Sequence, residues 1–168
     1  SSMVAAISGG NLYRETSFLL NSLNTKIASD ALSVIENPFL NKGHSSTYFD
    51  GEGVGLKERS LLDKGFLNGY FLSSYSARKL EMQTTGNSGG AHNLIVRSSK
   101  NSLSELIQGI DKGLLITELL GHGLNMVTGD YSRGAAGFWI ESGKIQHAVE
   151  EITIASNLKD MLLNIKAI

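Results

Sequence analysis

The sequence contains no cysteine, which excludes disulfide bonds and thiolate metal ligands. A cysteine-free chain agrees with a reducing compartment, so the cytoplasm is the expected location. Long apolar runs are also missing. No stretch approaches the roughly 20 residues that a membrane-spanning helix needs, and no basic-then-apolar leader opens the chain. We therefore expect a cytoplasmic protein with no membrane partner.

An excess of charge of either sign is absent as well, because 15 basic residues face 16 acidic ones. A nearly neutral protein does not steer polyanions to its surface, and the longest basic cluster is the pair Arg78 and Lys79. Nucleic acid is therefore not an expected partner. With 18% charged and 41% apolar residues, the composition predicts a folded globular chain.

The length of 168 residues fits one domain with a hydrophobic core. The sequence starts without an initiator methionine and is apolar at both ends, whereas natural termini are usually polar and loose. We expect residues 1–168 to form a single, truncated domain of a longer protein.

Helical periodicity, with apolar residues at i, i+3, i+4 and i+7, occurs in residues 103–110 and again in residues 158–165. Ser102 and Glu105 have the spacing of a capping box at the start of the first helix. Lys112 and Gly113 would mark its end. A third helix is expected over residues 75–82.

Two segments, residues 59–67 and 138–145, have the pattern of a β-hairpin: an apolar strand, a short turn ending in glycine and an apolar return. Because helices and strands do not alternate, the pattern favours an α+β fold with a largely antiparallel sheet, which could close into a barrel-like form. Further strands are expected at residues 32–36, 93–97, 114–118, 124–128 and 149–154.

Nineteen glycines are concentrated in segments that we expect to be loops, among them residues 51–55, 86–90, 121–123 and 129–137. Such loops allow close approach of a ligand, but they also form tight corners of a sheet. The last segment has the glycine spacing of a phosphate-binding loop, yet Ala135 stands where that loop requires lysine. A phosphate loop is therefore excluded.

The four histidines are widely separated, and no pair has the spacing that places two imidazoles on one metal ion. No metal site is therefore expected. His122 lies in a glycine-bracketed segment and could line a cleft with Asp130, Tyr131 and Arg133. A structural, hydrogen-bonding histidine is the alternative.

Ser132, His122 and Asp130 supply the residue types of a hydrolase triad, but Ser132 lacks the strand-turn-helix elbow that exposes such a nucleophile. A capped polar turn explains these residues better. Arg133 could bind a carboxylate such as a peptide terminus, or anchor its loop to an internal acid. The candidates for a peptide cleft are thus His122, Asp130, Tyr131, Ser132 and Arg133.

Several segments spread along the chain are similar to one family. The longest is residues 128–143, TGDYSRGAAGFWIESG, followed by VEEITIA at 149–155 and NLKDM at 157–161. Earlier segments are AAISGG at 5–10, FDGEGV at 49–54, SSYSARKL at 73–80 and TGNSGG at 85–90. With these segments the chain resembles the carboxyl-terminal domain of the TldD/PmbA family, in particular its PmbA (TldE) branch.

The resemblance implies a β-rich carboxyl-terminal domain of a metallopeptidase-related protein. In the TldD branch an H-E-x-x-x-H segment and a later cysteine hold zinc, and the glutamate acts as general base. That segment would fall just before and across residues 3–9, which contain neither histidine nor glutamate. The resemblance therefore implies no catalytic residue and no metal ligand in this chain, with zinc only in a TldD-type partner.

The expected function is a non-catalytic subunit that pairs with the TldD-type enzyme and helps to enclose and select unfolded peptides for proteolysis or peptide maturation. A homodimer is also open. Two alternatives stand beside this interpretation: a metallopeptidase or hydrolase in its own right, and a protein-binding modulator, as the family's older description as a modulator of DNA gyrase suggests. The neutral charge favours a protein over DNA as the modulator's target.

Overall fold

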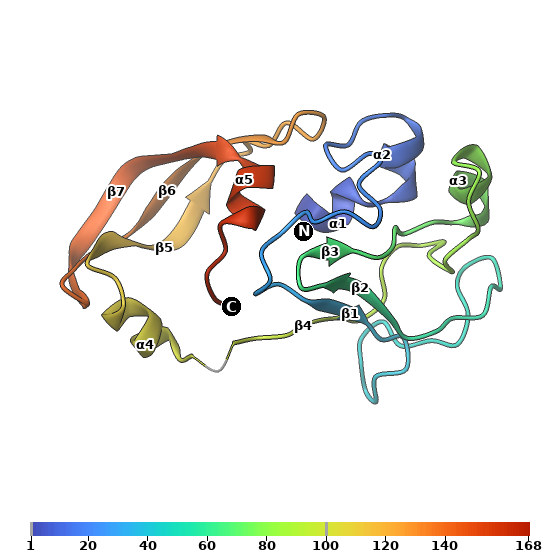
Figure 1. Cartoon of the computed structure of the whole chain (residues 1–168), viewed down its shortest axis with the longest axis horizontal. Helices are drawn as coiled ribbons and strands as arrows, with labels where there is room; N and C mark the ends of the chain where they lie inside the picture. Colours follow the sequence, from blue (N-terminus) through green and yellow to red (C-terminus); the bar gives the residue numbers. More distant parts are fainter. Residues whose placement is uncertain (1, 100) are drawn as a thin grey trace.

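The computed structural model describes residues 2–99 and 101–168 as short helices and antiparallel strands (Figure 1). The strands form two separate sheets, with strand orders β3-β2-β1-β4 and β5-β6-β7, which confirms the predicted α+β class. No single closed barrel forms within the described residues. The elements are α1 (Ser2–Ala6), α2 (Gly9–Tyr13), β1 (Val34–Glu36), β2 (Arg59–Asp63), β3 (Phe66–Leu67), α3 (Ser74–Lys79), β4 (Leu94–Val96), α4 (Leu103–Gln108), β5 (Lys112–Leu120), β6 (Asp130–Glu141), β7 (Lys144–Asn157) and α5 (Leu158–Leu163).

The hydrophobic core lies around the first sheet, where Leu62 of β2 and Val34 of β1 are buried and face each other across the strand pair. The predicted hairpin of residues 59–67 is confirmed as β2 and β3. Its turn residues Lys64 and Gly65 have φ values of 44° and 80°, as a two-residue hairpin turn requires.

The second sheet is a long meander with β6 in the middle. The predicted hairpin of residues 138–145 is confirmed as its β6–β7 turn. The prediction that residues 129–137 form a loop is wrong, because β6 begins at Asp130. Glycine in this strand reflects close packing: a Cβ atom at Gly137 would lie 2.0 Å from the carbonyl oxygen of Leu115 in β5.

All three predicted helices are present as α3, α4 and α5. The capping box of α4 is confirmed, because the Ser102 hydroxyl accepts from the Glu105 N–H and the Glu105 carboxylate accepts from the Ser102 N–H. The predicted end of this helix is wrong, since Lys112 and Gly113 begin β5. These two residues pair with Glu141 and Ile140 of β6, and α4 has already ended at Gln108.

The strand predicted at residues 124–128 is also wrong. Leu124 makes only an isolated bridge to Tyr131, and the following residues turn back. The side-chain oxygen of Asn125 accepts hydrogen bonds from the N–H groups of Val127 and Thr128. This local side-chain bonding stabilises a turn in competition with a strand.

The α5 helix joins the two parts of the fold, and it lies between the second sheet and α1 (Figure 1). Leu158 and Leu162 pack against the core of the first sheet, and the Ser29 N–H donates to the Leu162 carbonyl at 3.0 Å. In the described part of the chain, none of the helices has the length and apolar character needed to cross a membrane.

Candidate functional site

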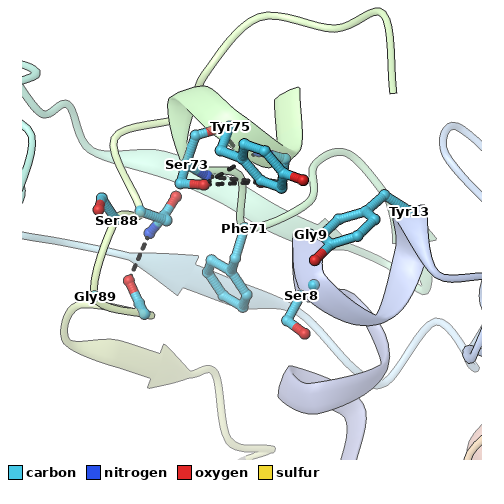
Figure 2. Close-up of a pocket in the computed structure, with 12 residues that line it drawn as sticks. Ser8, Gly9, Tyr13, Phe71, Ser73, Tyr75, Ser88 and Gly89 are labelled. Carbon is cyan, nitrogen blue, oxygen red and sulfur yellow. Dashed lines mark hydrogen bonds between the residues drawn. The ribbon is translucent and has the colours of Figure 1, made fainter. Parts of the chain in front are cut away.

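A cavity of about 380 Å³ lies between α2, the start of α3 and the glycine-rich turn of residues 86–90 (Figure 2). We call it the tyrosine cavity. Its lining is uncharged and offers hydroxyl groups, one side-chain amide, aromatic rings and glycine backbone. It is formed by residues 8–10, Tyr13, Phe71, Ser73, Tyr75, Ser76 and residues 87–90.

Two tyrosines form one wall of this cavity. The ring centroids of Tyr13 and Tyr75 are 5.6 Å apart and their planes meet at 83°, a favourable edge-to-face contact. Cations lie over both rings, with the Arg14 guanidinium 5.0 Å from the Tyr13 centroid and the Lys79 ammonium 5.8 Å from that of Tyr75. Tyr75 is 51% exposed, so its ring is accessible to a ligand.

The close packing of α2 against α3 determines the shape of the cavity. A Cβ atom at Gly9 would lie 2.3 Å from the Ser76 hydroxyl oxygen. That oxygen accepts from the Ser73 N–H at 3.0 Å, while the Ser73 hydroxyl accepts from the Ser76 N–H at 3.2 Å. Because this capping box fixes Ser76, only glycine fits at position 9 without displacing the wall.

The turn of residues 86–90 is held by a buried ion pair. Glu36 is 2% exposed, and one of its carboxylate oxygens accepts from Arg59 Nε at 2.7 Å. The other oxygen accepts from Asn87 Nδ2 at 2.8 Å and from the His92 N–H at 2.9 Å. Arg59 also donates to Asn87 Oδ1 at 2.8 Å. Since Asn87 lines the tyrosine cavity, this network holds that part of the cavity wall in place.

A second buried carboxylate, Asp50, holds the same turn to the preceding loop. Its Oδ1 accepts from the N–H groups of Glu52 and Val54, each at 2.9 Å, and its Oδ2 accepts from the Ser88 N–H at 3.0 Å. Burial raises the pKa of Asp50, but the three backbone donors, together with the charge of His92, outweigh it and lower the pKa below 3.8.

We expect Asp50→Asn to lower the free energy of unfolding by about 2 kcal/mol, because an amide loses the charge-assisted bonds and turns an N–H group toward a backbone donor. The folded-state pKa lies below the unfolded one, so the carboxylate stabilises the fold above pH 3.8 and loses this effect as pH falls through its folded-state pKa.

Urea unfolding of the unchanged protein and of Asp50→Asn, at neutral and strongly acidic pH, measures this difference. The exposed Asp63 provides a control as Asp63→Asn, which should change stability little at either pH. A loss of stability in Asp50→Asn that persists unchanged in acid would contradict the proposed role of the carboxylate charge.

Four of the five predicted cleft residues line a second cavity, of about 390 Å³, which we call the His122 cavity. They are His122, Asp130, Tyr131 and Ser132. The Ser132 N–H donates to the Gly123 carbonyl at 2.7 Å and thereby holds the loop against β6. The fold brings these four side chains to one place, while their binding of a peptide stays a prediction.

Asp130 is engaged within the chain. Its carboxylate accepts from the Thr128 hydroxyl at 2.6 Å and from Asn157 Nδ2 at 3.1 Å, and these bonds lower its pKa, with the larger effect from Thr128. Within residues 2–99 and 101–168, no hydrogen bond joins His122 to Asp130 or Ser132. The arrangement is that of a capped turn at the start of a strand.

Arg133, the fifth candidate, lies outside the His122 cavity. Its guanidinium donates to the backbone carbonyls of Leu119 and Leu120 in β5, at 3.2 and 3.5 Å. The side chain therefore anchors two neighbouring strands through carbonyl groups, and among the described residues it pairs with no acid.

The tyrosine cavity itself was not among the sequence-based site predictions. Its residues come from segments that carry the family resemblance, at 5–10, 73–80 and 85–90. That shared resemblance was a usable signal, but nothing in the sequence shows that these three segments meet.

Residues 3–9, where the resemblance would place metal ligands, do not fit zinc. Ala6 and Ile7 are fully buried in the core, and residues 3–9 offer only the thioether of Met3 and the hydroxyl of Ser8 beside backbone groups. Zinc in proteins is bound by Cys, His, Asp or Glu. In the described residues no group of three or more such side chains could hold a metal ion.

The sequence model of the PmbA/TldA metallopeptidase C-terminal domain matches residues 1–168. The chain is similar to Metalloprotease PmbA of Escherichia coli O157:H7, at 50% identity over 163 residues, covering 97% of this chain and 36% of the relative. The Haemophilus influenzae homolog is 48% identical over 169 residues, covering 100% and 38%. The chain thus spans well under half the length of these relatives.

Two solved structures show the same fold. One, from Bacteroides thetaiotaomicron, is described as a proposed modulator of DNA gyrase; it gives a TM-score of 0.91 at 40% identity, covering 96% of this chain and 36% of that one. TldE from Thermococcus kodakarensis gives 0.82 at 29% identity, covering 96% and 39%.

Proposed function

The chain belongs to the PmbA/TldA metallopeptidase family, and from this premise we propose that it is a non-catalytic partner subunit of a TldD-type zinc metallopeptidase. In this role it helps to enclose and select unfolded peptides for proteolysis or peptide maturation, and the zinc ion belongs to the partner. Residues 1–168 would be the carboxyl-terminal domain. Because the chain covers only 36–38% of its named relatives, the activity of the whole protein is part of this proposal.

The tyrosine cavity is the observation that carries the proposal. It includes Ser8 and Gly9 of the segment where the resemblance would place the metal ligands of the catalytic branch, and its lining is uncharged. Hydroxyl and amide groups can pair with the backbone of a peptide, while the rings of Tyr13 and Tyr75 offer aromatic contacts to its side chains. These properties suit a site that accepts unfolded peptides of many sequences.

The β5 strand supports the same function, because it offers a second means of holding an extended peptide. It is an edge strand of the second sheet, and none of its nine residues is fully buried. An edge strand presents unpaired backbone groups to which a peptide can add as a further strand, independently of its sequence.

A second candidate function is hydrolysis by this protein itself, favoured by the grouping of His122, Asp130 and Ser132 in one cavity. It requires further residues from outside this chain. A protein-binding modulator is the third candidate, and it rests on the description of the Bacteroides thetaiotaomicron structure.

The test measures zinc content and peptidase activity of the complete protein, alone and mixed with a TldD-type partner, on an unstructured peptide. We expect neither zinc nor activity alone, and activity in the mixture. In the mixture, Tyr75→Ala should raise KM about tenfold, because it removes aromatic contacts worth about 1.4 kcal/mol. His122→Ala should leave turnover unchanged. Stoichiometric zinc and activity in the protein alone would defeat the proposal.

A further inference from the structure

Three aromatic side chains in the loop of residues 38–49 are exposed. Phe39 is 46%, Tyr48 79% and Phe49 61% exposed, and the ring centroids of Phe39 and Tyr48 lie 5.8 Å apart. These three residues, which we call the aromatic cluster, line a cavity of about 650 Å³. A contiguous exposed apolar patch of this kind marks a binding surface, whereas single exposed side chains are ordinary.

The loop that carries the aromatic cluster has a fixed backbone. Asn37 Oδ1 accepts from the Phe39 N–H at 2.8 Å, and the Thr47 N–H donates to the Pro38 carbonyl at 3.0 Å. The Ser46 hydroxyl donates to the Leu40 carbonyl at 2.6 Å. Because these hydrogen bonds restrain the loop, they lower the backbone entropy that binding at the cluster would cost.

A further cavity, of about 310 Å³, lies between the aromatic cluster and the tyrosine cavity, among the loops of residues 45–51 and 88–92. It has lining residues in common with both neighbours, so the three cavities adjoin one another, and we call them together the groove. The loops that line it lie at the end of the molecule far from the second sheet (Figure 1). The shared residues are Ser88, Gly89 and Gly90 on one side and Ser46, Thr47 and Phe49 on the other.

At Gly89 and Gly90, in the middle of this groove, the backbone carries no side chain. Gly89 and Gly90 have φ values of 111° and 113°, and a Cβ atom at either position would meet nothing within 4 Å. Two hydrogen bonds hold their turn in place: Asn87 donates to Glu36, and the Ser88 N–H donates to Asp50. A ligand can therefore approach the backbone closely at this point.

The charge of the groove decides which ligand class fits. Asp50 is occupied by three backbone N–H groups, and His92 Nε2 lies 3.1 Å from the Gly86 carbonyl oxygen. Lys42 is the single basic side chain that lines the cavity of the aromatic cluster. An isolated lysine does not make the basic patch that a nucleic acid requires. Glycine backbone and hydroxyl groups between two aromatic ends instead match a polypeptide backbone between two apolar side chains.

We propose that this groove binds one extended polypeptide, with one side chain at Tyr13 and Tyr75 and a second, large apolar side chain at the aromatic cluster. The inference rests on the proposed function and adds its substrate class: segments in which two apolar side chains are separated by a stretch that crosses Gly89 and Gly90. Folded proteins bury such side chains, so the groove selects unfolded ones.

The test measures binding of fluorescent peptides to the complete protein. The peptides consist of Gly, Ser and Thr with one Phe, or with two Phe residues at increasing separations. At a matching separation the second Phe should tighten binding about tenfold, a typical effect of a buried aromatic anchor. The double variant Phe39→Ala/Tyr48→Ala should abolish this gain. Phe66→Ala should preserve it, because Phe66 has the same 46% exposure as Phe39 and lies outside the groove.

Equal affinity for one-Phe and two-Phe peptides at every separation would contradict peptide binding along the groove. A gain in affinity that survives in the double variant would contradict it too. Either result would leave the proposed function standing. Failure of every peptide to bind, both to the protein alone and to its complex, would overturn the proposed function and this inference with it. Sedimentation of both forms completes the test: dissociation of a dimer in the double variant would show that a second copy covers the cluster, against the inference.

Discussion

Replacement of Arg59 by methionine is expected to lower the free energy of unfolding by about 3–5 kcal/mol, the largest effect among the changes considered. The loss follows because the Glu36 carboxylate, with a side chain only 2% exposed, would be left without its cation. Arg59 also donates to the Tyr70 carbonyl at 2.9 Å and to Asn87 Oδ1, so two further acceptors lose their partner. Urea unfolding of the complete protein at neutral pH measures the change.

Two variants make this result specific to the buried pair. The double variant Glu36→Gln/Arg59→Met should recover part of the lost stability, because it also removes the uncompensated charge. Lys26→Met breaks the exposed ion pair with Asp30, whose N–O distance is 2.8 Å, and should change stability little. If Arg59→Met costs no more than Lys26→Met, the buried network does not stabilise the fold.

The same change should impair the tyrosine cavity. Asn87 loses its bond to Arg59, while its bonds to Glu36, Thr85 and Gly90 remain, so the turn of residues 86–90 is held less firmly. Peptide affinity of the complex should fall together with stability in Arg59→Met. In the double variant affinity should recover less than stability, because the Arg59 bond to Asn87 is still missing.

Gly123→Ala is expected to cost about 3 kcal/mol and to detach the loop that bears His122 from β6. An added Cβ atom would lie 1.6 Å from the Ser132 carbonyl oxygen and 2.6 Å from its carbonyl carbon. Both atoms belong to the backbone of β6, the middle strand. This backbone cannot move without disturbing its hydrogen bonds to β5 and to β7. The loop must therefore move, and the bond from the Ser132 N–H to the Gly123 carbonyl breaks.

Hydrogen exchange at the Ser132 amide, together with the melting temperature, measures this effect. Gly121→Ala is the matched control: its φ is 70°, but an added Cβ would meet no atom within 4 Å. It should cost only about 1 kcal/mol for the left-handed backbone and leave exchange at Ser132 slow. Equal effects of the two substitutions would mean that close packing at Gly123 does not hold the loop.

Several elements could be read from the sequence because they depend on residues that are near each other in the chain. The capping box of Ser102 and Glu105 spans three residues, and the hairpin turns at Gly65 and Gly143 need only a local positive φ. Apolar periodicity predicted α5 for the same reason. The segment at residues 128–143 carried the family resemblance, although its first part was mistaken for a loop.

That mistake had a physical cause. Glycine and small polar residues weaken a strand in isolation, and only the neighbouring strands show why they occur in β6. At Gly137 the β5 backbone is too close for any side chain, and at Asp130 the polar group caps a turn through Thr128 and Asn157. The sequence indicated that His122 and Asp130 could line one cleft. Both residues line the His122 cavity, while a role there stays a prediction.

By itself, therefore, the sequence determined the family, the α+β class and the local turns and caps. The tertiary structure alone decided where the tyrosine cavity lies and what supports it. Glu36 and Asn87 are 51 residues apart, and Arg59 is 23 residues from one and 28 from the other. Contacts over such separations arise from strand pairing and core packing, which no local pattern of residues encodes.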